Sequence, residues 1–191
     1  WLYTVYGPHH CALFARGELT AQLPNRGHFF NAEYPGKRLT PAGPDHAQIA
    51  TVNGLLDYVH AVADRHGLAG EPVQAKAEAV RRLFRDHETA LLQPLLDYLS
   101  KHPRVRLIGR LRASERAPTV AFTVPGRSSS ELAGGLAELK LGVGVGNFYA
   151  YRLLQALGID TDDGAVRVSF VHYTSAAEVH RLMEGLDQLL S

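Results

Sequence analysis

The sequence of 191 residues predicts an α/β protein, most of which forms an α+β domain with a small antiparallel sheet covered by helices. Two observations support this prediction. From about residue 70 onward, helical and extended patterns follow one another in the order α-β-β-α-β-α-β-α. Residues 165–173 then alternate apolar and polar side chains as a half-buried strand does, and an amphipathic helix follows them.

The N-terminal third is rich in turn-forming Gly-Pro and Pro-Gly pairs. Between two of these turns, residues 11–19 are expected to form a short strand. Apolar residues then recur at helical spacing, which predicts a helix over 46–66. Asp45 is suited to cap the start of this helix and Gly67 to end it.

A longer helix is predicted over residues 73–101, where it stops before Pro103. The elements expected after it are strands at 105–110 and 119–124, a helix capped within 128–130 and ending near 139, a short strand or loop at 141–146, a helix at 147–157, the strand at 165–173, and a last helix capped by Thr174 or Ser175.

The charge balance, the cysteine count and the lengths of the apolar runs limit the partners and the compartment that we expect. The 20 basic and 19 acidic residues give a net charge of +1, so nucleic acid or an anionic membrane surface is not expected as a partner. A single cysteine, Cys11, excludes an internal disulfide, fits a reducing compartment, and is expected to be a small buried apolar residue. No apolar run is long enough for a membrane span, and no signal peptide is recognised, so we expect a cytoplasmic protein.

The strand at 165–173 places one cation apart from the core. Val166, Val168 and Phe170 point to one face, which should meet the helices, and Arg167 points to the other. Two interpretations remain open from the residues alone. Arg167 is either an exposed or ion-paired arginine on a half-solvated sheet, or a clamp for a carboxylate, since its planar guanidinium matches a carboxylate in a bidentate way.

Three segments in this order carry a resemblance to a known family: "VYGPHH", then "LTPAGPDHAQIATVNGLLDYV", then "AVRVSFVHYTSAAEVHRLMEGLDQLL". Together they resemble the C-terminal half of the class V aminotransferases, fold-type I pyridoxal-phosphate (PLP) enzymes, and most closely the cysteine-desulfurase-like branch. The resemblance covers essentially the whole chain. It implies that residues 1–68 are the C-terminal remnant of the PLP-binding large domain, that residues 69–191 are the small domain, and that most of the large domain lies upstream.

The resemblance also implies a function and a set of site residues. It implies a PLP-dependent enzyme that acts on an amino acid, as a homodimer that needs the upstream residues. Arg167 would hold the substrate carboxylate, and Asn147 lies near the expected substrate loop, although it is equally suited to cap a helix. His9 would line the cofactor pocket, and the backbone amide of Gly43 would contact the cofactor phosphate.

The position of the Schiff-base lysine is occupied by threonine. In the family this lysine lies three residues before the glycine of a Gly-Pro turn, and counting back from Gly7 gives Thr4. Threonine has no amine and cannot form an imine. Thr4 is therefore a true replacement in a non-catalytic relative, an engineered change, or the neighbour of a cofactor-bearing lysine that the sequence omits. We favour the third explanation, because the residues downstream match an intact enzyme half.

Other departures from the family narrow the chemistry. The segment "GVGVGNFYAYRLL" lacks the cysteine that carries the persulfide in desulfurases, so strict desulfurase chemistry is not expected, while transamination, racemisation and lyase chemistry remain open. The neighbouring His9 and His10 point apart on an extended turn, and no metal site is expected. The alternative to an enzyme is a non-catalytic homologue or isolated small domain that serves dimerisation or protein binding.

Overall fold

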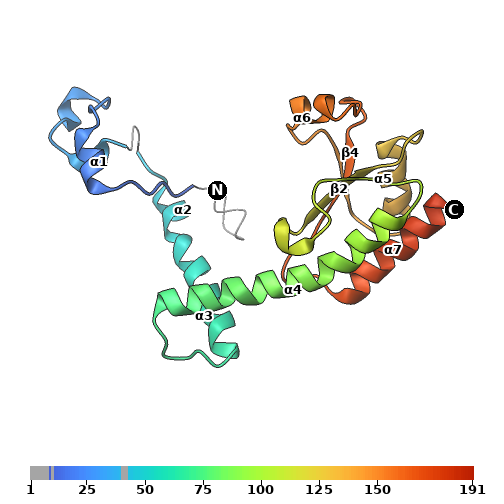
Figure 1. The fold of residues 1–191 in the computed structure, drawn as a ribbon. Helices are drawn as coiled ribbons and strands as arrows, with labels where there is room; N and C mark the ends of the chain where they lie inside the picture. The colour runs from blue at the N-terminus through green and yellow to red at the C-terminus, as the bar shows by residue number, and fades with distance from the viewer. Residues whose placement is uncertain (1–8, 10, 40–42) are drawn as a thin grey trace. The chain divides into compact units, whose positions relative to one another are not determined.

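The computed structural model describes residue 9 and residues 11–39 and 43–191. Contacts divide the chain into two compact units, Trp1–Val80 and Arg81–Ser191, which are described separately. The helices of the first unit (Figure 1) are α1 (Gly17–Gln22), η2 (Phe29–Asn31), η3 (Pro35–Lys37), α2 (His46–Ala50), α3 (Val52–Arg65) and the start of α4 (Val73–Lys101). The domain boundary expected after residue 68 stays a prediction.

The helix expected over 46–66 is present as two helices. Asp45 caps α2 as predicted, since its Oδ1 accepts a hydrogen bond from the Gln48 amide at 3.1 Å. The helix is interrupted at Thr51, whose hydroxyl donates to the Gln48 carbonyl at 2.5 Å. A side-chain bond of this kind competes with the helical pattern. Gly67, with φ of +81°, follows the end of α3 as predicted.

The strand expected over 11–19 is wrong, and so is the burial expected for Cys11. Residues 11–16 have no regular structure, and α1 begins at Gly17. Cys11 is exposed. The physical reason is the lack of a covering layer: among the described residues of this unit, Ala63 and Val80 are the apolar side chains that are buried. A strand needs a partner to satisfy its backbone, and no described segment pairs with 11–16.

The second unit contains the small antiparallel sheet that the sequence predicts. Its strands are β1 (Arg106–Ile108), β2 (Thr119–Thr123), β3 (Gly144–Gly146) and β4 (Ala165–Ser169), in the order β1-β2-β4-β3, and all three pairings are antiparallel. The helices between and after them are α5 (Ser129–Glu138), α6 (Tyr151–Ala156) and α7 (Ala176–Leu190), with the short η4 (Ala113–Glu115) between β1 and β2. The predicted alternation of helices and strands is confirmed.

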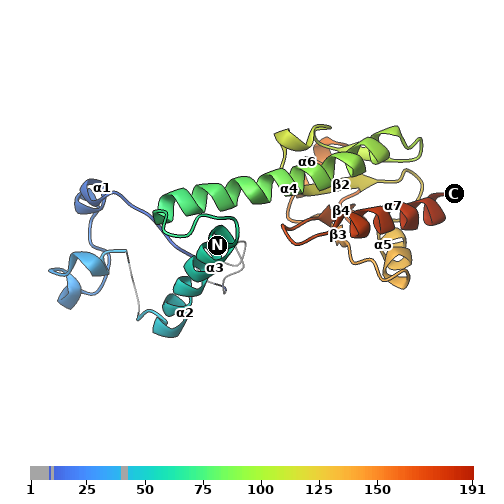
Figure 2. The same cartoon turned by 90° about the horizontal axis from the view of Figure 1, so that it is seen from below.

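Helices α4, α5 and α7 cover one face of this sheet (Figure 2). The predicted inward set, Val166, Val168 and Phe170, is buried there together with Phe122 of β2. The remaining buried apolar residues of this core come from the three helices, from η4, and from β2 and the residue after it: Leu91, Leu92, Leu95, Leu96, Leu99, Ala113, Val120, Val124, Leu132, Leu136, Val179, Leu182, Leu186 and Leu190. This cluster therefore packs on one side of the sheet.

The opposite face carries one row of residues that crosses all four strands. Ile108 pairs with Ala121, Ala121 with Arg167, and Arg167 with Gly144. Because side chains alternate along a strand, all four lie on the face turned away from Val166 and Val168. Arg167 is thus the long side chain in a row where its two immediate neighbours are alanine and glycine.

Two serines cap helices α5 and α7, within the positions that the sequence predicts. The Ser128 hydroxyl accepts from the amides of Ser130 and Glu131, and α5 begins there. Ser175 forms a capping box with Glu178 at the start of α7. These caps fix the ends of the helices that pack on the sheet.

Candidate functional site

Among the residues that the structure describes, the guanidinium of Arg167 has no counter-charge. Arg167 is half-buried on β4, and among the described residues it makes no ion pair or side-chain hydrogen bond. Its Nε is buried and lacks an acceptor. A buried donor without a partner is costly, and it is not offset by any ion pair among the described residues. The terminal nitrogens are not buried in this way, so the unpaired charge favours an anion that binds there from outside the described residues.

An aromatic ring lies over the guanidinium. The Cζ of Arg167 is 4.0 Å from the centroid of the Phe148 ring, a cation–π contact. Gly144, the strand neighbour of Arg167, leaves room for that ring. A Cβ added to Gly144 would lie 3.2 Å from Cε1 of Phe148 and 3.6 Å from Nε of Arg167. A side chain at position 144 would therefore crowd the Phe148 ring.

The loop that carries Phe148 has an unusual backbone. Phe148 and Tyr149 have φ values of +50° and +61°, in the left-handed region that residues other than glycine rarely occupy. Asn147 holds this turn, because its Oδ1 accepts from the Tyr149 amide at 3.1 Å and its carbonyl accepts from the Ala150 amide at 2.8 Å. Its Nδ2 donates to the Thr161 carbonyl at 3.3 Å. The role of Asn147 at a substrate stays a prediction, and its described contacts are all within the chain.

The helix expected from residue 147 begins only at Tyr151, because two left-handed residues cannot continue a right-handed helix. The alternative role of Asn147 as the cap of this helix is wrong. Ala150 is the residue that precedes α6, and Tyr149 is fully exposed. Phe148 was missed by sequence reasoning. The glycine-rich run before Asn147 signals a turn, but it does not reveal which side chain returns to the sheet.

The residues proposed to contact the cofactor belong to the first unit. Thr4 lies outside the described residues. His9 and Gly43 are exposed, and nothing lies within 4 Å of the place where a Cβ on Gly43 would stand. Lys76 is buried and pairs with Asp64 at 2.6 Å, so it is not available to bond a cofactor. The Schiff-base position beside Thr4, the pocket role of His9 and the phosphate contact of Gly43 therefore stay predictions.

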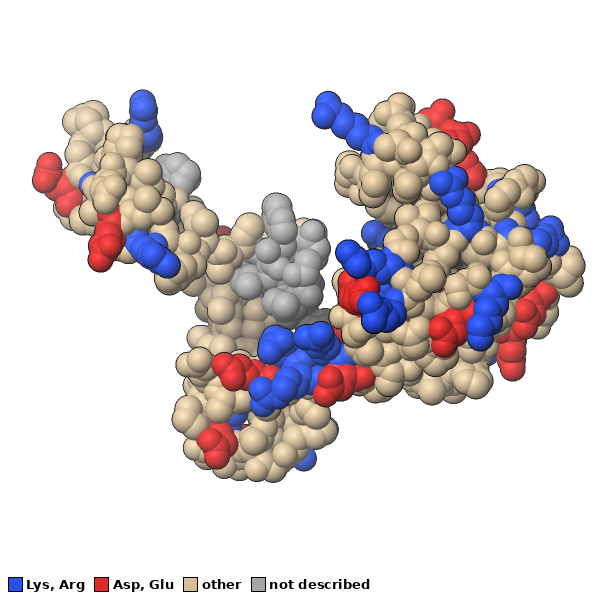
Figure 3. Space-filling model, viewed as in Figure 1, with Lys and Arg blue, Asp and Glu red and all other residues tan. Residues whose placement is uncertain are grey.

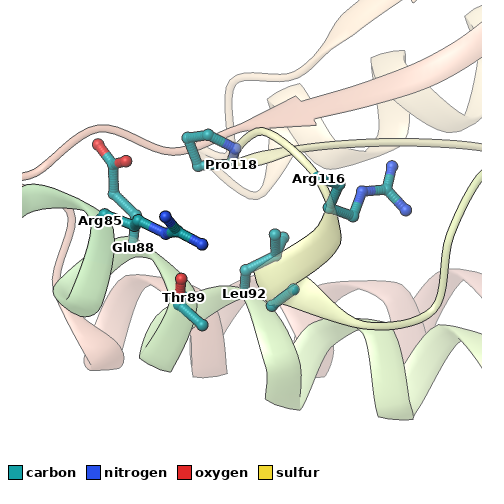
Figure 4. A pocket seen from close by; sticks show the side chains of 7 residues that line it. Arg85, Glu88, Thr89, Leu92, Arg116 and Pro118 are labelled. Carbon is teal, nitrogen blue, oxygen red and sulfur yellow. The ribbon is translucent and has the colours of Figure 1, made fainter.

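A separate small cavity of about 40 Å³ lies among Arg85, Glu88, Thr89, Leu92, Ala113, Arg116 and Pro118 (Figure 4). It has room for about one or two water molecules and none for an amino acid. Burial raises the pKa of Glu88, and the charge of His87 opposes this rise. Burial lowers the pKa of Arg116, which donates to the carbonyls of Ile108, Arg110 and Thr119 and so closes the β1–β2 connection.

Two histidines lie near the end of β4: His172 follows this strand, and His87 belongs to α4. His172 stacks on Phe84, with ring centroids 3.8 Å apart. His87 Nε2 lies 2.8 Å from the Thr174 carbonyl. Burial and then the charge of His87 lower the pKa of His172, so this imidazole favours its neutral form. This pair joins the end of β4 to helix α4.

Three further features of the described residues are their charge, their hydropathy and their possible metal ligands. On the face in view, basic and acidic side chains lie among one another (Figure 3). None of the described helices is both long and apolar enough to cross a membrane. Within the same residues, no group of three or more histidine, cysteine or acidic side chains is arranged to hold a metal ion.

Comparison with known proteins gives the family. The aminotransferase class-V pattern matches residues 77–182, more than half of the chain. The aminotransferase-like protein FGM3 of Gibberella zeae is 30% identical over 191 residues, which cover 98% of this chain and 44% of that protein. A probable cysteine desulfurase of Pseudomonas putida is 29% identical over 164 residues, covering 82% of this chain and 35% of that protein.

A solved structure agrees at the level of the fold. The cysteine desulfurase CsdA of Escherichia coli superposes with a TM-score of 0.58 at 24% identity, over 80% of this chain and 32% of that one. This confirms the predicted fold-type I class. The chain spans less than half the length of these relatives. With its small antiparallel sheet, its covering helices and the matched family pattern, the chain belongs to the class-V aminotransferase family.

Proposed function

We propose that the chain is the C-terminal half of a PLP-dependent enzyme that acts on an amino acid, and that Arg167 binds the carboxylate of that substrate. One observation carries the second part: the guanidinium is held in place on the sheet and has no counter-charge among the described residues. A bidentate carboxylate pair would satisfy its charge and fix the orientation of the substrate's α-carbon. Pyridoxal phosphate, when bound, supplies the electron sink for bond breaking at that carbon.

The exposed apolar side chains of the first unit support the proposal that further polypeptide covers it. Many of its large apolar side chains are exposed, which is unusual for a completed core. They are Leu13, Phe14, Leu19, Leu23, Phe29, Phe30, Tyr34, Leu39, Ile49, Leu56, Tyr58 and Val73. We propose that this face packs on the rest of the large domain, which is expected to supply most of the cofactor contacts besides His9 and Gly43. The complete protein is proposed to be a cytoplasmic homodimer.

The test of the carboxylate role uses the full-length protein and a matched pair of probes. L-alanine carries the carboxylate, and ethylamine is the same molecule without it. Calorimetric titration of Arg167→Ala should show a dissociation constant for L-alanine raised about tenfold to a hundredfold, as expected for a charged hydrogen-bonded pair. Binding of ethylamine should be unchanged. Equal affinity of Arg167→Ala and the native protein for L-alanine would refute the clamp.

A second candidate function is favoured by Thr4, which has no amine to bond the cofactor. In that case the protein is a non-catalytic homologue that serves dimerisation or protein binding. The discriminating measurement is borohydride reduction of the full-length protein followed by peptide mass analysis. A pyridoxyl-lysine peptide next to Thr4 supports the enzyme. A threonine peptide with no such adduct anywhere, together with no visible cofactor absorption, supports the non-catalytic homologue.

A further inference from the structure

An arginine side chain has many rotamers, so some contact must hold the Arg167 guanidinium in its position. No described acidic group or carbonyl holds it. The contact that the structure does provide is the Phe148 ring, 4.0 Å from Cζ. An aromatic face attracts a cation without using its N–H groups, so these stay available to a ligand.

The surroundings of Phe148 are built for this contact. Asn147 folds the loop so that Phe148 and Tyr149 take left-handed conformations, which cost free energy. One of the two rings returns to cover Arg167, while the other, on Tyr149, is fully exposed. The absence of a side chain on Gly144 provides the space into which the ring returns. The strained backbone, the turn held by Asn147 and the space at Gly144 all help to place the Phe148 ring over Arg167.

We infer that Phe148 is a positioning residue that orders the Arg167 guanidinium for binding the carboxylate of an amino acid. The inference rests on the proposed function of Arg167. Nε is buried without a partner, whereas the two terminal nitrogens, which also make no hydrogen bond among the described residues, are not buried in this way. The two terminal nitrogens are therefore the groups that meet a carboxylate. Ordering them before the ligand arrives reduces the entropy lost on binding.

The experiment compares three substitutions in the full-length protein by calorimetric titration with L-alanine and ethylamine. Phe148→Leu removes the aromatic face and keeps an apolar side chain. Phe148→Tyr keeps the face and serves as the rescue. Tyr149→Leu is the matched control, because it removes the neighbouring ring from the same strained loop without a contact to Arg167.

The expected result is a dissociation constant for L-alanine raised about twofold to thirtyfold in Phe148→Leu, as a cation–π contact would give. Phe148→Tyr and Tyr149→Leu should bind L-alanine like the native protein, and ethylamine should bind equally to all. Gly144→Ala gives a second route, because its Cβ would push the ring away without removing it. It should weaken L-alanine binding in the same direction.

A readout independent of binding is the NMR signal of the Arg167 Nε–H, identified by its loss in Arg167→Lys. The ring current of Phe148 should shift this signal in the native protein and in Phe148→Tyr, and the shift should disappear in Phe148→Leu. If Phe148→Leu keeps native affinity while Arg167→Ala loses it, the positioning role is wrong and the clamp stands. If Arg167→Ala keeps native affinity, the proposed function itself fails. Equal weakening by Tyr149→Leu would attribute the effect to the loop and overturn the role of the ring.

Discussion

Asp163 binds the backbone of Ser129: its two carboxylate oxygens accept from this one amide at 3.0 and 2.8 Å. Oδ1 also accepts from the Ser128 hydroxyl at 2.8 Å. The loop before β4 is thereby attached to the first turn of α5, where a negative charge also complements the helix dipole. Burial alone would raise the pKa of Asp163, but the hydrogen bonds from Ser129, Ser128 and Ser130 outweigh it and hold the pKa below its usual value.

This lowered pKa predicts a pH dependence of stability. The folded-state pKa lies below the unfolded one, so the stabilisation is complete above about pH 4 and is lost as pH falls through the folded-state value. The free energy of unfolding in urea should therefore fall below pH 4, and Asp163→Asn should reduce this dependence. Asp162→Asn is the control, and an unchanged pH profile in Asp163→Asn would contradict the role of the carboxylate.

His172 predicts a second pH dependence, nearer neutrality. Its pKa is lowered in the folded state, so between that value and about 6.5 the unfolded chain binds the extra proton. Stability from this group is present above about pH 6.5 and lost as pH falls below it. His172→Phe, which keeps a ring to stack on Phe84, should flatten the thermal unfolding profile between about pH 5 and 7. His180→Gln, at an exposed site on α7, should leave the slope as in the native protein.

Gly164→Ala should destabilise the sheet strongly. Gly164 has φ of +70°, and an added Cβ would stand 2.2 Å from the carbonyl carbon of Gly146, at the end of β3. Backbone atoms cannot move aside as a flexible side chain can, so we expect a loss of at least about 2 kcal/mol. Gly142→Ala has open space around its Cβ and should change the unfolding free energy by less than about 1 kcal/mol. Similar losses in the two variants would show that the close approach of Gly164 to Gly146 does not decide the effect.

The ion pair between Lys76 and Asp64 predicts an asymmetric response. The Lys76 side chain is 7% exposed and that of Asp64 is 46% exposed. Asp64→Asn leaves a buried ammonium without its partner and should cost about 1–2 kcal/mol, reduced from the full buried-pair value by the solvent around Asp64. Adding Lys76→Met should recover most of this loss, because a methionine fills the same space without charge. Hydrogen exchange of the α3 and α4 amides gives the measurement, and additive losses in the double variant would contradict the pair.

Helix positions were the more predictable part of the fold. The bounds of α4 agree with the predicted 73–101, because apolar spacing and Pro103 mark them locally. The last strand was predicted too long. It ends at Ser169 because the Val171 amide bonds to the Thr174 hydroxyl at 3.1 Å, and a turn begins there. The apolar alternation continues past this turn, so periodicity alone could not show the end of the strand.

The site was predictable only in part. The alternation around Arg167 shows from sequence which face it occupies, because that depends on neighbouring residues alone. Its contact with Phe148 depends on two left-handed residues that local propensity disfavours, and on a glycine that faces Arg167 only in the register of β3 with β4. Such information is non-local, and no pattern within the loop contains it.

In the row from Ile108 through Ala121 and Arg167 to Gly144, the position of Arg167 also affects which register of β4 is stable. A slip of β4 by one residue would turn Arg167 into the apolar interior and bring Val166 or Val168 out to solvent. The misfolded form would then contain a buried, unpaired cation, which is among the most costly errors a core can hold. Arg167, which is proposed to bind the substrate carboxylate, therefore also disfavours the slipped register of β4. Folded molecules should then have Arg167 on the face of the sheet that is turned away from the core.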